Sequence, residues 1–229
     1  MTTIAVVSAG LSQPSSSRRL ADRLADAAAV ALDRADRAGG ASRRIDIDLR
    51  PLAHDIVEAL LTGRFGPELE RAVREVQSAD ALVFVTPVFS AGISGVAKSF
   101  LDVLPPDAVH DLPTLLGATG GSARHSLALE QSIRPVFAYL RASVAPTAVF
   151  VAPEDWSSAG AAPLEARIRR AGDDLAWLVG ASRRSRAVLP AWGDVEEASI
   201  DGTRGAEEEG AMPGHGTSGA TELVRATGA

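Results

Sequence analysis

The chain has 229 residues, 46% of them hydrophobic, which is enough to bury the core of a globular domain and excludes a wholly disordered protein. Acidic residues number 29 against 23 lysines and arginines, and this net charge of −6 excludes the concentrated basic surface that binds duplex nucleic acid. No run approaches the roughly 18 consecutive apolar residues of a membrane span, and the N-terminus lacks the marks of an export signal, so we expect a soluble cytoplasmic protein.

The first part of the chain alternates between strand-like and helical patterns. Residues 4–7 form a short β-branched apolar run, which predicts a buried parallel strand. Apolar residues at helical spacing over 20–32 predict an amphipathic helix that ends at Gly39-Gly40. The alternation of apolar and charged residues over 45–50 then predicts a half-exposed edge strand.

The middle of the chain continues this alternation. A short helix or loop is expected over 52–61, followed by a helix over 67–77 that has proline at its first position. Residues 81–85 predict a second buried strand, broken by Thr86-Pro87. Helical spacing of apolar residues returns over 94–104.

Two further strands and two further helices are expected after residue 110. Strands are predicted over 113–118 and 147–152, and between them a helix over 123–141 that Pro135 kinks or interrupts. The last helix carries its apolar residues over 164–179. Five strands that alternate with helices predict an α/β fold with an open parallel sheet, whose ligand site lies beyond the carboxyl ends of the strands.

Composition changes near the end of the chain. Glycine, glutamate, serine and threonine dominate from about Ala191 onward, and apolar residues there are single. We therefore divide the chain into a folded domain over 1–187 and a disordered Gly/Glu-rich tail over 188–229.

The loop between the first strand and the first helix is rich in serine. Five hydroxyls lie within ten residues, on Ser8, Ser12, Ser15, Ser16 and Ser17. These hydroxyls, together with the N–H groups and the dipole of the following helix, favour an anion. The loop has neither the ending of a P-loop nor the G-x-G-x-x-G of a dinucleotide-binding turn, so a monophosphate fits best. The alternative is a simple helix cap in a serine-rich turn.

The loop after the third strand is suited to a flat apolar ring. Pro87 lacks an N–H donor, while Gly92 and Gly95 allow close backbone approach. A ring could lie against Val88 and Phe89 while backbone N–H groups meet its polar edge. The alternative is a tight turn in which Phe89 packs into the core.

The loop after the fourth strand begins with Thr119 and two glycines, Gly120 and Gly121. N–H groups exposed there could stabilise negative charge on the pyrimidine edge of a reduced flavin. His125 follows in the first turns of the next helix, and we interpret it as a binding residue rather than a catalyst.

The other residues that could carry chemistry are interpreted as structural. Cysteine is absent, which excludes disulfides, thiolate metal sites and cysteine nucleophiles. No metal site is predicted, because three histidines lack partners at metal-ligand spacing: His54, His110 and His215. Lys98 and Asp102 are expected to form a surface or interface ion pair. Core or subunit-interface positions are expected for Trp156, Trp177 and Trp192.

Three segments together resemble one known family. Ser8–Leu20, residues 86–104 (TPVFSAGISGVAKSFLDVL) and residues 119–130 (TGGSARHSLALE) look like the NADPH-dependent FMN reductase family. The likeness is closest to the FMN reductases associated with luciferase-like flavin monooxygenases, and it covers residues 3–185.

The resemblance implies a flavodoxin-like, doubly wound five-stranded parallel sheet in the order 2-1-3-4-5. It also implies FMN bound without a covalent link, NADPH or NADH as hydride donor, a homodimer or homotetramer, and a flavin-dependent monooxygenase as partner. The phosphate would be held by Ser8, Ser12, Ser15, Ser16 and Ser17. The isoalloxazine would be flanked by Pro87, Val88, Phe89, Ser90, Ala91 and Gly92, and closed on its other side by Thr119, Gly120, Gly121 and His125. No catalytic side chain is assigned, because the flavin carries the bond-making chemistry.

Two alternatives stay open at this point. One is a quinone, azo-dye or metal-ion reductase with FMN as prosthetic group. The other is a flavodoxin-type electron carrier that oxidises no pyridine nucleotide. A receiver-type signalling domain is rejected, because serines and Thr86-Pro87 stand where that domain needs acidic residues.

Overall fold

The computed structural model describes residues 1–36 and 40–188, with side chains as far as residue 184. The tail predicted over 188–229, with Trp192 and His215, therefore lies outside the described residues apart from Val188. Gly39, one of the two glycines predicted to end the first helix, is outside them as well; the described helix ends at Ala35.

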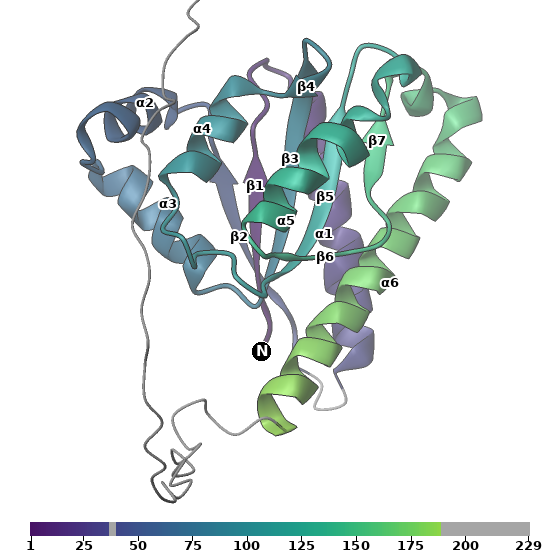
Figure 1. Ribbon diagram of the computed structural model, residues 1–229. Helices are drawn as coiled ribbons and strands as arrows, with labels where there is room; N and C mark the ends of the chain where they lie inside the picture. Colours follow the sequence, from purple (N-terminus) through teal and green to yellow (C-terminus); the bar gives the residue numbers. More distant parts are fainter. Residues whose placement is uncertain (37–39, 189–229) are drawn as a thin grey trace, which may run out of the picture. The chain divides into compact units, whose positions relative to one another are not determined.

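A parallel sheet runs through the molecule with helices on both faces (Figure 1). Its strands are β1 (Thr3–Ser8), β2 (Arg43–Asp48), β3 (Ala81–Phe89), β4 (Gly92–Ile93), β5 (Pro113–Thr119), β6 (Ser143–Val144) and β7 (Val149–Val151). The order is β2-β1-β3-β5-β6, with β7 also paired to β5 and β4 antiparallel to β3. The five predicted strands correspond to β1, β2, β3, β5 and β7, so the flavodoxin-like order 2-1-3-4-5 is confirmed.

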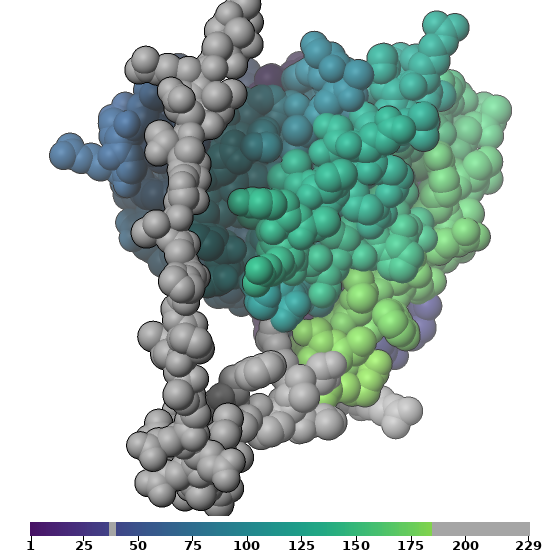
Figure 2. Space-filling view, in the orientation of Figure 1, coloured from purple at the N-terminus to yellow at the C-terminus, as the bar shows by residue number. Residues whose placement is uncertain are grey.

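The helices form two layers. One face of the sheet is covered by α1 (Ser16–Ala35) and α6 (Ser158–Val188). The opposite face is covered by α2 (Ala53–Thr62), α3 (Pro67–Gln77), α4 (Gly95–Val103) and α5 (Arg134–Tyr139). The second layer forms the surface towards the viewer in Figure 2, with α6 at its edge. None of the helices described is long and apolar enough to cross a membrane.

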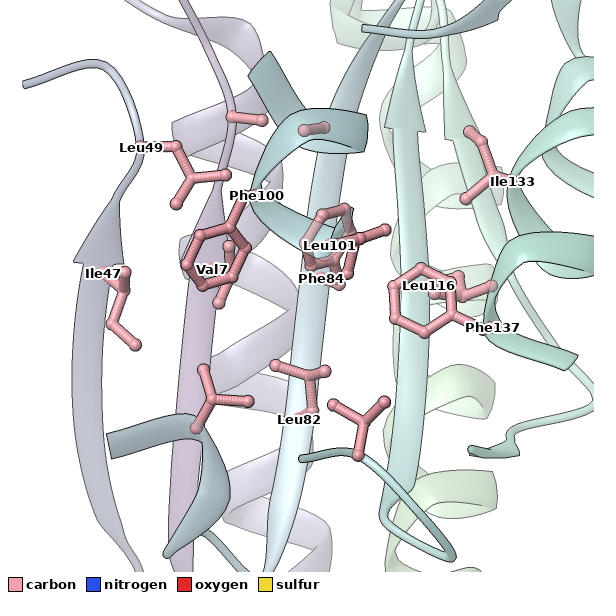
Figure 3. Close-up of a cluster of buried hydrophobic side chains, with 14 of the residues drawn as sticks. Val7, Ile47, Leu49, Leu82, Phe84, Phe100, Leu101, Leu116, Ile133 and Phe137 are labelled. Carbon is pink, nitrogen blue, oxygen red and sulfur yellow. The ribbon is translucent and has the colours of Figure 1, made fainter. Parts of the chain in front are cut away.

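Each face of the sheet has its own apolar core. Phe84 of β3 meets Phe137 of α5 edge to face, with ring centroids 5.0 Å apart, and Phe100 of α4 packs in the same cluster (Figure 3). On the other face α1 and α6 approach closely at Gly172, where a β-carbon would lie 2.7 Å from the carbonyl carbon of Ala27. The two cores hold the strand ends, and the loops that follow them, in fixed positions.

The predicted break at Thr86-Pro87 is wrong, because β3 continues to Phe89. Pro87 pairs with Thr119 near the end of the parallel ladder, and the chain then turns back into β4. A proline is tolerated there because few ladder bonds remain to be made, and the hydroxyl of Thr86 donates to the Pro87 carbonyl at 2.9 Å.

The single helix predicted over 123–141 is also wrong. The segment consists of a 3₁₀ turn, η1 (Ala123–His125), a π turn, η2 (Leu129–Ile133), and then α5. Pro135 removes one backbone donor at the start of α5, and the wider turn before it accommodates that loss.

Two smaller differences concern the last elements. The long helix α6 begins at Ser158, before the predicted apolar positions, because its first turn consists mainly of small residues. Trp177 on this helix is 66% exposed, so of the two positions expected for it the core is wrong, and the subunit interface stays a prediction. Trp156, in the 3₁₀ turn η3 (Pro153–Trp156), is half-buried.

Candidate functional site

The three predicted loops meet at one edge of the sheet. They follow β1, β3 and β5, which are neighbours in the strand order. The register pairs Ser8 with Val85 and Pro87 with Thr119, so the strands end side by side. Segments about a hundred residues apart in sequence are therefore brought together, as the sequence predicted.

The serine loop divides its hydroxyls between the protein and solvent. Ser15 is the N-cap of α1, and its Oγ accepts from the N–H of Arg18 at 3.1 Å. Ser12 and Ser16 are exposed, whereas Ser8 is 1% exposed at the end of β1. The cap of the alternative interpretation is therefore present, and it involves one serine of the five.

Ser17 reaches across to the third loop. Its Oγ lies 2.7 Å from Oγ1 of Thr119, and both side chains are buried. This contact joins the first turn of α1 to the last residue of β5. The sequence predicted both residues as ligands but not their contact with each other.

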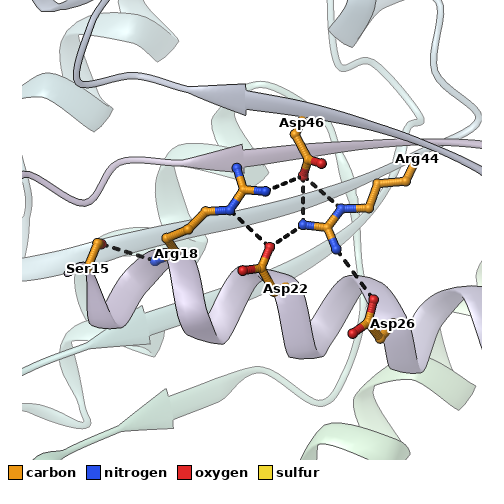
Figure 4. A network of polar contacts seen from close by, with 6 residues as sticks. All are labelled: Ser15, Arg18, Asp22, Asp26, Arg44 and Asp46. Carbon is orange, nitrogen blue, oxygen red and sulfur yellow. Dashed lines mark hydrogen bonds and ion pairs between the residues drawn. The ribbon is translucent and has the colours of Figure 1, made fainter. Parts of the chain in front are cut away.

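The two arginines that follow the serines are held in other contacts. Arg18 makes 2.9 Å ion pairs with Asp22 and with Asp46 of β2, and Arg44 binds the same two carboxylates (Figure 4). Burial lowers the pKa of Arg44, but its hydrogen bonds and charge interactions with Asp46 and Asp22 outweigh this effect and raise it above the ordinary value. This network ties α1 to β2 beside the loop.

Arg19 stacks on an aromatic ring. Its guanidinium carbon lies 4.0 Å from the centroid of Trp156, and Arg23 lies 5.7 Å from the same ring.

A hollow of about 450 Å³ lies beside the serine loop. It is lined by Ser8, Gly10, Ser12, Gln13, Pro14, Ser15, Arg18, Arg19, Asp22, Arg23, Asp48 and Arg50. The surroundings of the loop thus favour an anion even though Arg18 is already paired.

The second loop is a tight hairpin. Val88 pairs with Ile93 and Phe89 with Gly92, so Ser90 and Ala91 form the two-residue turn. Both turn residues have positive φ, 49° and 61°, which is the geometry of a type I′ hairpin and is costly for side chains other than glycine. The tight turn of the alternative interpretation is thus present, but its burial of Phe89 in the core is wrong, because that side chain is 49% exposed.

The third loop is closed on one side and open on the other. The N–H of Gly120 donates to Val151 at 3.0 Å, and a β-carbon there would meet the Phe150 ring at 2.7 Å. Gly121, in contrast, has open space where a side chain would start, and His125 in η1 is exposed. The second glycine and the histidine are therefore open to a ligand, whereas the N–H group of Gly120 is already bonded within the protein.

One residue of the site was missed in the sequence. Ser132, in the π turn η2, accepts a hydrogen bond from the N–H of Ile93 at 3.3 Å and so supports the hairpin of the second loop. Nothing in the periodicity marks it, because the contact depends on the wider turn.

Lys98 and Asp102 form the predicted ion pair, at 2.6 Å on the surface. Within the described residues no cluster of three histidine or acidic side chains could hold a metal ion.

Comparisons with known proteins point to one family. Residues 2–157 match the family model described as NADPH-dependent FMN reductase. The chain is 37% identical over 142 residues, 61% of its length and 76% of the relative, to the NADH-dependent FMN reductase SfnE of Pseudomonas putida.

Solved structures are similar over most of the chain. An oxidoreductase from Corynebacterium diphtheriae superposes with a TM-score of 0.75 at 41% identity, covering 79% of this chain and 98% of that one. The apo form of the NADH:FMN oxidoreductase EmoB superposes with a TM-score of 0.65 at 27% identity, covering 77% of this chain and 89% of that one.

Proposed function

The chain belongs to the NADPH-dependent FMN reductase family, and on this premise we propose how its three loops bind FMN during reduction by NADPH or NADH. The protein is an NAD(P)H-dependent FMN reductase. The observation that carries the proposed binding mode is the convergence of the three loops on the edge formed by β1, β3 and β5.

The residues present fit a flavin phosphate at the first loop. Gly10 has no room for a side chain, since a β-carbon would lie 1.9 Å from Ser15 Oγ, so the loop folds tightly around the start of α1. The N–H groups of Ser16 and Ser17 precede any helical carbonyl that could accept them. Hydroxyls and N–H groups, rather than arginines, are therefore proposed to hold the phosphate.

The isoalloxazine is proposed to lie between the second and third loops. The exposed ring of Phe89 and the buried Val88 offer an apolar side, and the strained turn at Ser90 and Ala91 holds their backbone in place. On the other side, a β-carbon at Gly121 would meet no atom within 4 Å, so the backbone there is open to the proposed ring. The remaining members of this proposed set are Pro87, Gly92, Thr119, Gly120 and His125.

The flavin supplies the redox chemistry, since its N5 accepts a hydride from nicotinamide C4. The protein's residues bind, orient and exclude water. Backbone N–H groups at the third loop stabilise negative charge on the pyrimidine edge. No side chain needs to act as nucleophile, and none is assigned.

Anaerobic mixing tests this function. The protein with FMN is mixed with NADPH and, separately, with NADH, and the visible absorbance of the flavin is followed. We expect bleaching by at least one of them, with many flavin molecules reduced per protein under turnover. If neither nucleotide bleaches the flavin, the protein is an electron carrier and the reductase function is wrong.

A quinone reductase is separated from an FMN reductase by the acceptor. If the protein reduces quinone while added free FMN is never reduced, then FMN is a prosthetic group and not the substrate. We expect free FMN to be reduced.

The assembly and the downstream acceptor are further parts of this proposal. We propose a homodimer or homotetramer, which the large exposed side chains of Tyr139 and Leu61 on the helical layer support. We also propose that reduced flavin passes to a flavin-dependent monooxygenase. Sedimentation measures the first, and transfer of reduced flavin to an added monooxygenase measures the second.

A further inference from the structure

The hydroxyl groups of Ser17 and Thr119 carry two protons, and the hydrogen bond between them needs only one. Each hydroxyl has one proton and can also accept hydrogen bonds, and either oxygen can be the donor across the 2.7 Å separation. Among the described residues neither oxygen has a second hydrogen-bond partner. One hydroxyl therefore keeps a proton to donate, in a place where the two side chains are only 2% and 7% exposed.

Thr114, on the same strand, shows how a buried threonine hydroxyl is ordinarily bonded. Thr114 is 0% exposed, and its hydroxyl proton is donated to the carbonyl of Leu112 at 2.9 Å. Its donor is thus satisfied within the protein, as is usual for a buried hydroxyl. At Thr119 packing alone would be served equally well by valine, which has the same shape and a high strand propensity. A ligand explains the hydroxyl better than packing does.

On the basis of the proposed function, we propose that Thr119 is a positioning residue for the flavin phosphate and acts through Ser17. Its hydroxyl donates to Ser17 Oγ, and the proton of Ser17 is then directed to a phosphate oxygen. Thr119 is thereby assigned to the phosphate rather than to the ring.

The charge of the ligand determines the direction of this chain of hydrogen bonds. A phosphate dianion accepts hydrogen bonds and cannot donate, so Ser17 in the first turn of α1 must be the donor to it. Ser17 Oγ is then free to accept from Thr119, and each bond in such a chain strengthens the other. In the opposite direction the Ser17 proton would be used on Thr119, and the free proton would then lie on Thr119, at the end of β5, rather than at the start of α1 where the phosphate is proposed to bind.

The arrangement couples the loops. Thr119 pairs with Pro87 at the end of the ladder between β3 and β5. It is the last residue of β5, and the third loop begins there. A hydrogen bond from this position to Ser17 ties the phosphate end of the site to the ring end. Correct placement of the phosphate then depends on a residue from the far side of the site.

Binding of FMN and of riboflavin, which lacks the phosphate, tests the proposal. Dissociation constants are measured by flavin fluorescence for the unaltered protein and for Thr119→Val, Thr119→Ser, Ser17→Ala and the Ser17→Ala/Thr119→Val double variant. Thr114→Val is the matched control, since it removes a buried hydroxyl at the opposite end of β5. Circular dichroism establishes that each variant is folded.

We expect Thr119→Val to weaken FMN binding about tenfold, the usual effect of losing a hydrogen bond that supports a charged group. Riboflavin binding should change less than about twofold, and Thr119→Ser should restore FMN binding. In the Ser17→Ala background Thr119→Val should have no further effect, because the route through Ser17 is already lost. Thr114→Val should leave both affinities unchanged.

Three results would overturn the proposal. One is an equal loss of FMN and riboflavin affinity in Thr119→Val, which would place the hydroxyl at the ring or in the fold. Another is a loss of FMN affinity on Thr119→Val that is as large in the Ser17→Ala background as in the unaltered protein. The third is failure of Thr119→Ser to restore binding. If the unaltered protein binds neither flavin, the proposed function itself is wrong and this assignment fails with it.

Discussion

The hydroxyl of Ser15 occupies the space that a side chain at Gly10 would need. A β-carbon on Gly10 would lie 1.9 Å from Ser15 Oγ and 3.0 Å from Ser15 Cβ. The same oxygen caps α1 by accepting from the N–H of Arg18. The serine loop therefore leaves no room for a side chain at residue 10 while Ser15 caps the helix, which explains the glycine there.

Replacement of Gly10 by alanine should disturb this cap. The added methyl group must push Ser15 out of its position, so the free energy of unfolding should fall by about 1 kcal/mol, the usual effect of losing an N-cap. FMN binding should weaken as well, because the start of α1 shifts. Urea denaturation measures the first effect. Gly95→Ala, at a position with open space, is the control, and an equal loss in both variants would contradict the argument.

Ser16→Asp should separate binding from stability. Ser16 is exposed in the first turn of α1, where a carboxylate interacts favourably with the helix dipole, so stability should not fall. The same charge repels a phosphate dianion, and FMN affinity should drop at least about tenfold. Riboflavin affinity should stay the same. Unchanged FMN affinity would mean that the phosphate does not bind at this loop. The Ser16→Ala variant is the control for loss of the hydroxyl without added charge.

Phe89→Ala should affect both flavins alike. The side chain is 49% exposed at the hairpin, so its removal should change the free energy of unfolding by less than about 0.5 kcal/mol. If the ring of the flavin lies against it, the dissociation constants for FMN and riboflavin should rise by the same factor. Titration of each flavin into the variant measures this. A loss confined to FMN would contradict the proposed position of the ring.

Gly172→Ala should destabilise the contact between α1 and α6. A β-carbon would lie 2.7 Å from backbone atoms of Ala27, and backbone cannot move aside without separating the helices. We expect a loss of about 1–3 kcal/mol in the free energy of unfolding. Gly180→Ala on the same helix is the control. Its β-carbon would come within 3.3 Å only of the mobile end of Arg184, so higher helix propensity should stabilise it. Equal destabilisation of the two variants would contradict the packing argument.

Much of the fold follows from local patterns. The helix over 67–77 was predicted with its observed bounds, because Pro67 and the apolar spacing are both local signals. The segment 123–141 was not, since the π turn before Pro135 is supported by Ser132 reaching the distant β4. Likewise β3 continues past Pro87 because Thr119 and Ile93 offer partners that no local pattern reveals.

The sequence by itself determined the α/β class, the order of strands and helices, the three loops and the likeness to FMN reductases. These depend on turn residues and on hydrophobic periodicity, which act between near neighbours in the chain. Only the tertiary structure decided which contact each serine hydroxyl makes: Ser15 caps the helix, Ser17 forms a hydrogen bond with Thr119, and Ser16 is exposed. A hydroxyl looks the same in sequence whatever it bonds, and its partner is set by which strand ends the sheet places beside it.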